Sequence, residues 1–223
     1  RSPPSNSSAA SDVYKRQGVG VIRGIIASAP TIDDIVATPT GFLSTVLDAN
    51  GNQTATLVAS GSNRRAVTID EIPKNLQHAF VAIEDERFYE HNGIDVTGII
   101  RAGVKGVASG FHFSEGASTI TQQLLKNTVF TSWTSESSMA DKFERKFQEQ
   151  YLALQLEKVV DKDWILENYL NAINLGQNTL GVGVASERYF GKDVSDLTLS
   201  ECAVLAAITQ NPVSYTHLTL PTN

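Results

Sequence analysis

The spacing of hydrophobic residues along the chain changes at Pro73. After Pro73, apolar residues recur every three or four positions, which predicts amphipathic helices. Before it, two β-prone runs, 44–48 and 53–58, flank Asn50 and Gly51. An Asn-Gly pair between such runs is a strong turn signal, so we expect a β-hairpin. The predicted helices cover residues 74–91, 95–109, 118–129, 140–160, 163–174, 180–190 and 199–209.

Both ends of the chain resemble translated adapter DNA. Residues 12–17 can be encoded by a DNA string whose reverse complement, read in another frame, encodes residues 213–217 and the start of a leucine codon. Natural domains have no reason to begin and end with inverted copies of one string, so these ends are excluded from fold reasoning. We expect a non-native tail (1–17), a linker with the hairpin (18–70), a mainly α domain that is truncated at its C-terminal end (71–212) and a second non-native tail (213–223).

The chain is acidic, with 18 basic and 24 acidic residues and a net charge of −6. This balance argues against a nucleic-acid partner, which needs a basic face. The single cysteine, Cys202, lies in an apolar helical run, so neither an internal disulfide nor a cysteine-based metal site is expected. Crossing a bilayer takes about 20 apolar residues. The nearest candidate, residues 19–29, is short and is interrupted by Arg23.

The segment from residue 79 to residue 93 carries the first candidate chemistry. At helical spacing, Glu84, Phe88 and His91 share one face. A glutamate that is partly desolvated beside an aromatic ring suits a general base. The alternative is a solvated glutamate at the rim of a core helix. The neighbouring apolar stripe consists of Leu76, Ala79, Phe80 and Ile83.

A second constellation runs from a glycine turn into a helix over residues 115–127. Thr119 and Gln122 fit a capping box, and Ser118 is also available as a cap. A helix start with free amide groups is a ready anion site, and Lys126 lies one turn beyond Gln122 on the same face. The pattern favours a phosphate or pyrophosphate site. The alternative is an ordinary capped helix with a surface lysine.

A third constellation lies on the long amphipathic helix predicted over residues 141–157. Arg145 and Lys146 stand four and three positions before Glu149. The alternative interpretation is two ion pairs on the helix surface, each of which would stabilise the helix by about 0.3 kcal/mol. The functional interpretation is a second carboxylate held by two cations, as sugar transfer requires. We expect the core stripe of this helix to consist of Phe143, Phe147, Tyr151 and Leu154, joined by Leu152 and Leu156.

Five short motifs follow one another in the second part of the chain. They cover residues 84–93 (Glu-Asp-x-x-Phe-x-x-His-x-Gly), 116–123 (Gly-x-Ser-Thr-Ile-x-Gln-Gln), 145–149 (Arg-Lys-x-x-Glu), 165–171 (Ile-Leu-Glu-x-Tyr-Leu-Asn) and 183–192. In this order they resemble the glycosyltransferase domain of class A penicillin-binding proteins and monofunctional peptidoglycan transglycosylases. Each motif alone is weak, but the ordered set is specific.

The resemblance implies an enzyme that polymerises lipid II into peptidoglycan strands, inverts the donor anomeric carbon and releases undecaprenyl pyrophosphate. Glu84 would be the general base and Glu149 the second carboxylate. Some members use a divalent cation, Mg or Mn, at the pyrophosphate. The substrate-binding residues would be Asp85, Phe88, His91, Gly116, Ser118, Thr119, Gln122, Gln123, Lys126, Asn127, Arg145 and Lys146.

The implied fold is mainly α: a lysozyme-like, two-lobed glycosyltransferase domain behind the short N-terminal β-hairpin. The partners would be lipid II, the growing lipid-linked glycan strand and the membrane surface. Residues 98–113 would dip into the membrane, the alternative being a buried connecting helix. We expect a place on the outer face of the bacterial cytoplasmic membrane. The truncation would have removed an N-terminal anchor helix, and a C-terminal transpeptidase domain where the protein has one.

Two other functions remain open from sequence alone. A lysozyme-like glycan hydrolase would use water in place of a sugar hydroxyl and needs no pyrophosphate site. A non-catalytic glycan-binding scaffold predicts loss of motif residues, yet Glu84, Lys126 and Glu149 are all present. A generic helical interaction module is a weaker third alternative.

Overall fold

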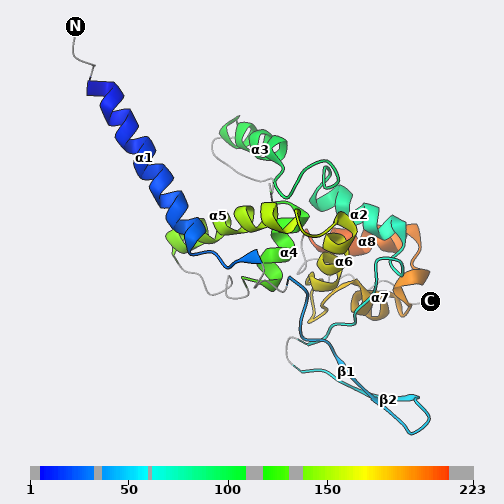
Figure 1. Ribbon diagram of the computed structural model, residues 1–223. Coiled ribbons are helices and arrows are strands. Elements are labelled where there is room, and N and C mark those ends of the chain that lie inside the picture. Colours follow the sequence, from blue (N-terminus) through cyan, green and yellow to red (C-terminus); the bar gives the residue numbers. More distant parts are fainter. Residues whose placement is uncertain (1–5, 33–36, 60–61, 109–117, 131–137, 211–223) are drawn as a thin grey trace.

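The computed structural model describes the chain except for residues 1–5, 33–36, 60–61, 109–117, 131–137 and 211–223 (Figure 1). The predicted C-terminal tail and the predicted site residue Gly116 therefore lie outside the described residues. The mainly α class with a short hairpin is confirmed. The elements are α1 Asn6–Ala27, β1 Ser44–Leu47, β2 Gln53–Leu57, α2 Lys74–Glu84, α3 Val96–Ala108, α4 Ile120–Thr128, α5 Met139–Leu156, α6 Lys162–Ala172, α7 Val182–Phe190, the 3-10 helix η3 Val194–Asp196 and α8 Leu199–Ile208.

The predicted hairpin forms between β1 and β2, which pair antiparallel. Its turn is fixed by the carboxylate of Asp48, which accepts hydrogen bonds from the amides of Asn50 and Asn52 at 2.8 Å. Gly51 adopts φ +85°, a conformation that glycine reaches without strain. Every residue of both strands is exposed, and the hairpin extends away from the helices (Figure 1). It therefore adds nothing to the core.

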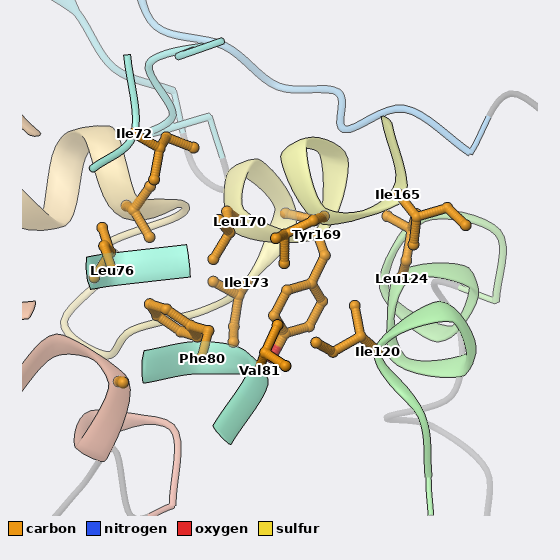
Figure 2. Close-up of a cluster of buried hydrophobic side chains, with 14 of the residues drawn as sticks. Ile72, Leu76, Phe80, Val81, Ile120, Leu124, Ile165, Tyr169, Leu170 and Ile173 are labelled. Carbon is orange, nitrogen blue, oxygen red and sulfur yellow. The ribbon is translucent and has the colours of Figure 1, made fainter. Parts of the chain in front are cut away.

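The core lies where α2, α4 and α6 meet (Figure 2). Tyr169 points from α6 toward Val81 and Ile120, and its ring meets Phe80 edge-on with centroids 6.3 Å apart. Burying each large apolar side chain contributes about 1.5–3 kcal/mol, so this cluster fixes the end of α2 beside the start of α4. Its labelled members are Ile72, Leu76, Phe80, Val81, Ile120, Leu124, Ile165, Tyr169, Leu170 and Ile173.

The helix α2 ends at Glu84, which corrects the predicted span of 74–91. Asp85 leaves the helical region with φ −158°, and the chain turns through the following residues. The buried Asp85 carboxylate accepts hydrogen bonds from other elements, so tertiary contacts override the helical period. Glu84, Phe88 and His91 therefore do not share one helix face.

The buried face of α5 also differs from the prediction. Leu152 and Leu156 are buried as predicted, and Tyr151 packs against the core. Phe143 is 63% exposed and Leu154 is 39% exposed, so the prediction is wrong for these two residues. The first turns of α5 project beyond the core, and Figure 1 shows them beside the end of α1. There the Gln148 amide donates to Ser28 Oγ at 3.0 Å. The residues that α5 buries are Gln148, Glu149, Leu152, Ala153 and Leu156.

The last helix, α8, lies against α2 and ends close to Glu84 (Figure 1). A capping box at its start joins Thr198 and Glu201. The Lys192 ammonium, 2.7 Å from the carboxylate, and the Thr198 amide hold the pKa of Glu201 down at about 2. Among the described residues, no helix has both the length and the apolar character required to cross a bilayer.

A glycine at position 93 is required by two separate constraints. Gly93 adopts φ +91°, and a Cβ atom there would stand 2.6 Å from the carbonyl oxygen of Ala153. We predict that Gly93→Ala lowers the free energy of unfolding by about 3 kcal/mol. The backbone strain of the positive φ and the steric clash of the new Cβ atom with Ala153 both contribute to this loss. Urea denaturation measures the loss.

Gly103→Ala is the matched control for this prediction. Gly103 lies in α3, and a Cβ atom there meets nothing within 4 Å. Alanine should raise helix stability by about 0.5–1 kcal/mol at this position. Equal unfolding midpoints for the two variants would contradict the assigned role of Gly93.

Candidate active site

A cleft of about 590 Å³ opens between α2, the start of α3, α4 and α5. Its walls are predominantly polar and charged. The cations include Arg87, Arg101, Lys126, Arg145 and Lys146. Such a cleft suits a charged substrate, because fixed cations compensate the charge that a bound anion brings in.

The cleft gathers most of the residues predicted from the motifs. Glu84 and Lys126, which belong to different motifs, line the same cavity. Phe88 and His91 do not line it, and Gly116 lies outside the described residues. The predicted residues in the cleft wall are Glu84, Asp85, Ser118, Thr119, Gln122, Gln123, Lys126, Asn127, Arg145, Lys146 and Glu149.

The Glu84 carboxylate is half-buried at the C-terminal end of α2 and is held by three hydrogen-bond donors. Gln123 Nε2 donates to Oε2 at 2.8 Å. Thr209 Oγ1 donates to Oε1, and Gln210 Nε2 reaches the same oxygen at 3.3 Å. These donors come from α4 and from the segment after α8. The carboxylate thus has a fixed orientation at the cleft wall.

Gln123 connects Glu84 with the core. Its Oε1 accepts from the Tyr169 hydroxyl at 3.5 Å, while its Nε2 donates to Glu84. Burial raises the pKa of the Tyr169 phenol well above its ordinary value, and the charges of Glu84 and Asp85 raise it further. Tyr169 therefore stays a neutral donor. This orients the Gln123 amide with its NH₂ group toward Glu84.

Asp85 joins the end of α2 to the start of α4. Its buried carboxylate accepts from the Ile120 amide at 2.9 Å and contacts His91 Nε2 at 3.0 Å. The Thr119 hydroxyl accepts from the Gln122 backbone amide, which confirms Thr119 as the cap. The Gln122 side chain donates to the Gly93 carbonyl instead, so the predicted capping box does not form. The Ile120 and Gln122 amides at this helix start are therefore not free, contrary to the prediction of free amides for an anion. The Asp85 carboxylate lies where an anion bound to the Ile120 amide would lie.

Glu149 is fully buried on α5 and forms ion pairs with Arg145 and with Lys146, the latter at 3.0 Å. Lys146 Nζ also donates to Ser118 Oγ at 2.8 Å. These are not surface ion pairs, because the carboxylate is removed from water. A buried anion needs such partners, and in return it holds both cations at the cleft wall.

Comparison with known proteins agrees with this arrangement. The family described as Transglycosylase matches residues 50–223, more than half of the chain. The chain belongs to the transglycosylase family. Penicillin-binding protein 1A of Clostridium perfringens strain 13 is 47% identical over 201 residues, which cover 88% of this chain and 28% of that protein. Penicillin-binding protein 1F of Bacillus subtilis is 45% identical over 179 residues, 80% of this chain and 24% of that protein. The chain thus spans about a quarter of the length of these relatives.

Phe88 and His91 do not line the transglycosylase cleft but pack behind the turn that follows Asp85. Phe88 is fully buried and meets the His91 ring edge-on, with centroids 6.4 Å apart. The Lys162 ammonium stands 4.4 Å from the Phe88 ring centroid and donates to the His91 carbonyl at 2.8 Å. Both motif residues therefore hold the turn that carries Asp85. The structure gives them a supporting position in place of the predicted substrate contact.

Sequence reasoning assigned no site role to Arg87, Asp95 and Gln210, which line this transglycosylase cleft, or to Thr209, which contacts Glu84 from outside the lining. Thr209 and Gln210 reach Glu84 from the segment after α8, and no local pattern predicts that contact. Arg87 forms an ion pair with Asp95, whose Oδ1 accepts from the Gly98 amide at 2.9 Å. Asp95 stands three positions before Gly98, which is the spacing of a helix N-cap. A search for caps would therefore have identified Asp95, but not its ion pair with Arg87.

Two carboxylates in the wall of this transglycosylase cleft are paired with cations. Glu149 pairs with Arg145 and Lys146, and Asp95 pairs with Arg87. Within the described ranges, no group of three or more His, Cys, Asp or Glu side chains is placed to hold a metal ion. A divalent cation would need phosphate oxygens of the substrate to complete its ligands. The predicted Mg or Mn stays a prediction.

The burial of Glu149 predicts a large stability effect. Glu149→Ala should lower the free energy of unfolding by about 3–5 kcal/mol, because it leaves the mostly buried Arg145 guanidinium without this carboxylate. Glu144→Ala on the same helix is the control, since Glu144 is exposed and should change stability by about 0.5 kcal/mol or less. Urea denaturation compares the two. Similar losses would show that Glu149 is only a surface ion-pair residue.

Proposed function

We propose that this domain is a peptidoglycan glycosyltransferase, which polymerises lipid II with inversion at the donor anomeric carbon and releases undecaprenyl pyrophosphate. One observation carries the proposal: the oriented carboxylate of Glu84 and the cations Lys126, Arg145 and Lys146 line a single cleft. A base and an electrostatic site for a departing diphosphate are the two groups that this transfer requires. Family membership and the two named relatives support the same reaction class.

Glu84 acts on the acceptor sugar. Its carboxylate takes the proton of the 4-hydroxyl of N-acetylglucosamine while that oxygen attacks the anomeric carbon of the donor N-acetylmuramic acid. One C–O bond forms and the C–O bond to the pyrophosphate breaks, so the electron pair leaves with the diphosphate. Attack from the face opposite the leaving group inverts the anomeric centre from α to β. Gln123, Thr209 and Gln210 hold the carboxylate in one orientation for this step.

The cations stabilise the charge that develops on the leaving group. Lys126 lies on α4, and Arg145 and Lys146 lie on α5, at the wall of the same cleft. Fixed cations lower the barrier more than mobile water does, because they need no reorganisation during the reaction. In this proposal Glu149 holds Arg145 and Lys146 in place and does not itself contact the sugar. A divalent cation at the diphosphate would add to the same charge compensation.

A hydrolase is the second candidate considered for this cleft. Retaining and inverting glycosidases use two carboxyl groups that both reach the reacting sugar or water. Glu149, the second carboxylate of the motifs, is fully buried and paired with two cations, so it is unsuited to that role. The proposal therefore favours a sugar hydroxyl as the acceptor. The untested expectations of an outer-face membrane location, an N-terminal anchor and a transpeptidase partner belong to this proposal.

Glu84→Gln tests the proposal directly. The amide keeps the shape of the side chain but cannot accept the proton, so lipid II consumption should fall by about 10²- to 10⁴-fold. Glu90→Gln is the control, since Glu90 is exposed and does not line the cleft. A time course of lipid II consumption by the purified chain in detergent micelles compares both variants with the parent. Equal rates for Glu84→Gln and Glu90→Gln would overturn the assignment, and cleavage of preformed glycan would favour the hydrolase.

A further inference from the structure

Thr209 reaches the proposed general base from the far end of the chain. It follows the last residue of α8, and its partner Glu84 lies 125 positions earlier. The Thr209 hydroxyl stands within hydrogen-bond distance of two acceptors, Oε1 of Glu84 and the carbonyl oxygen of Ala206, the latter at 2.8 Å. A hydroxyl carries one proton, so it can donate to only one of them at a time. The charge of Glu84 determines which of the two acceptors receives this hydrogen bond.

The other two donors to Glu84 are amide groups and cannot accept a hydrogen bond from it. Gln123 and Gln210 present amide NH₂ groups, which donate and do not accept. A hydroxyl both donates and accepts, so of these three groups only Thr209 can donate to the charged Oε1 and accept a hydrogen bond from Oε1 when that oxygen carries a proton. Thr209 does not line the cleft, whereas Gln210 does. Thr209 therefore acts on Glu84 and not on the substrate.

The backbone around Thr209 is firmly placed. Cys202, Leu205, Ala206 and Ile208 are buried, so the last two turns of α8 are held against the rest of the domain. The Thr209 amide is bonded to the Ala206 carbonyl at 3.3 Å. Rotation of the hydroxyl hydrogen about the Cβ–Oγ1 bond can therefore direct it to either acceptor while Oγ1 stays in place.

We propose that Thr209 is a positioning residue for the general base. Its hydroxyl donates to Oε1 of the ionised Glu84 and turns to the Ala206 carbonyl when Glu84 takes a proton. This inference rests on the proposed function. The proton that Glu84 gains is the one released by the acceptor hydroxyl, and the Thr209 proton is never transferred. Thr209 thereby supports the carboxyl group both before and after the proton transfer.

Three variants at position 209 separate this role from packing. Thr209→Val keeps the shape and removes the hydroxyl, Thr209→Ser keeps the hydroxyl, and Thr209→Ala removes the hydroxyl without adding an apolar contact. Thr128→Val is the matched control. Thr128 ends α4, and its hydroxyl donates to the Leu124 carbonyl at 2.8 Å, without any contact to Glu84.

The experiment measures kcat and KM for lipid II polymerisation together with thermal unfolding. A hydrogen bond to a charged group predicts a fall in kcat of about 10- to 100-fold for Thr209→Val, with KM changed by less than about threefold. Thr209→Ser should restore most of the rate. Thr128→Val should lose a similar amount of stability but keep kcat.

Two results would overturn the proposal. One is a kcat for Thr209→Val equal to that of Thr128→Val, and the other is failure of Thr209→Ser to restore the rate. If Thr209→Val does not fold, the same comparison is made with Thr209→Ala. Failure of the proposed function is recognised separately, because Glu84→Gln would then polymerise lipid II as fast as the parent chain.

Discussion

The carboxylate of Asp85 is the interaction on which the cleft depends. It ends α2, because its side chain turns away to accept hydrogen bonds from His91 and from the Ile120 amide. That second bond fixes the start of α4 directly beside the end of α2. Glu84 precedes Asp85, and Gln123 and Lys126 follow Ile120 along α4, so one buried carboxylate helps to bring Glu84 and Lys126 into the same cleft. The aromatic and aliphatic core beneath it prevents this junction from opening.

A second buried carboxylate, Glu149, organises charge where α5 lines the cleft. Glu149 has no solvent contact, and its desolvation is compensated by Arg145 and Lys146. An anion that was buried alone would be strongly destabilising, so the pairing is a condition of folding. Its consequence is that two cations are held at the wall of the cleft.

Local patterns in the sequence were sufficient for the hairpin and for most helices, because turn residues and apolar periods act over a few positions. The Thr119 cap and the ion pairs of Glu149 were also predictable from spacing alone. The end of α2 was not, since a contact of Asp85 with an amide 35 positions away overrides the helical period. The contact of Thr209 with Glu84 spans 125 positions and has no local signal at all. Long-range hydrogen bonds therefore determine the end of α2 and the surroundings of Glu84, which the hydrophobic period does not predict.

Amide hydrogen exchange at Ile120 tests this account most directly. Ile120 is the first residue of α4, so its amide has no partner within the helix. Among the described residues, the Asp85 carboxylate is the acceptor of its hydrogen bond. The account predicts slow exchange at Ile120 in the parent chain and much faster exchange in Asp85→Ala, while the Gln123 amide, bonded to the Thr119 carbonyl at 3.0 Å, stays protected. Unchanged protection of Ile120 in Asp85→Ala would contradict the central role of Asp85.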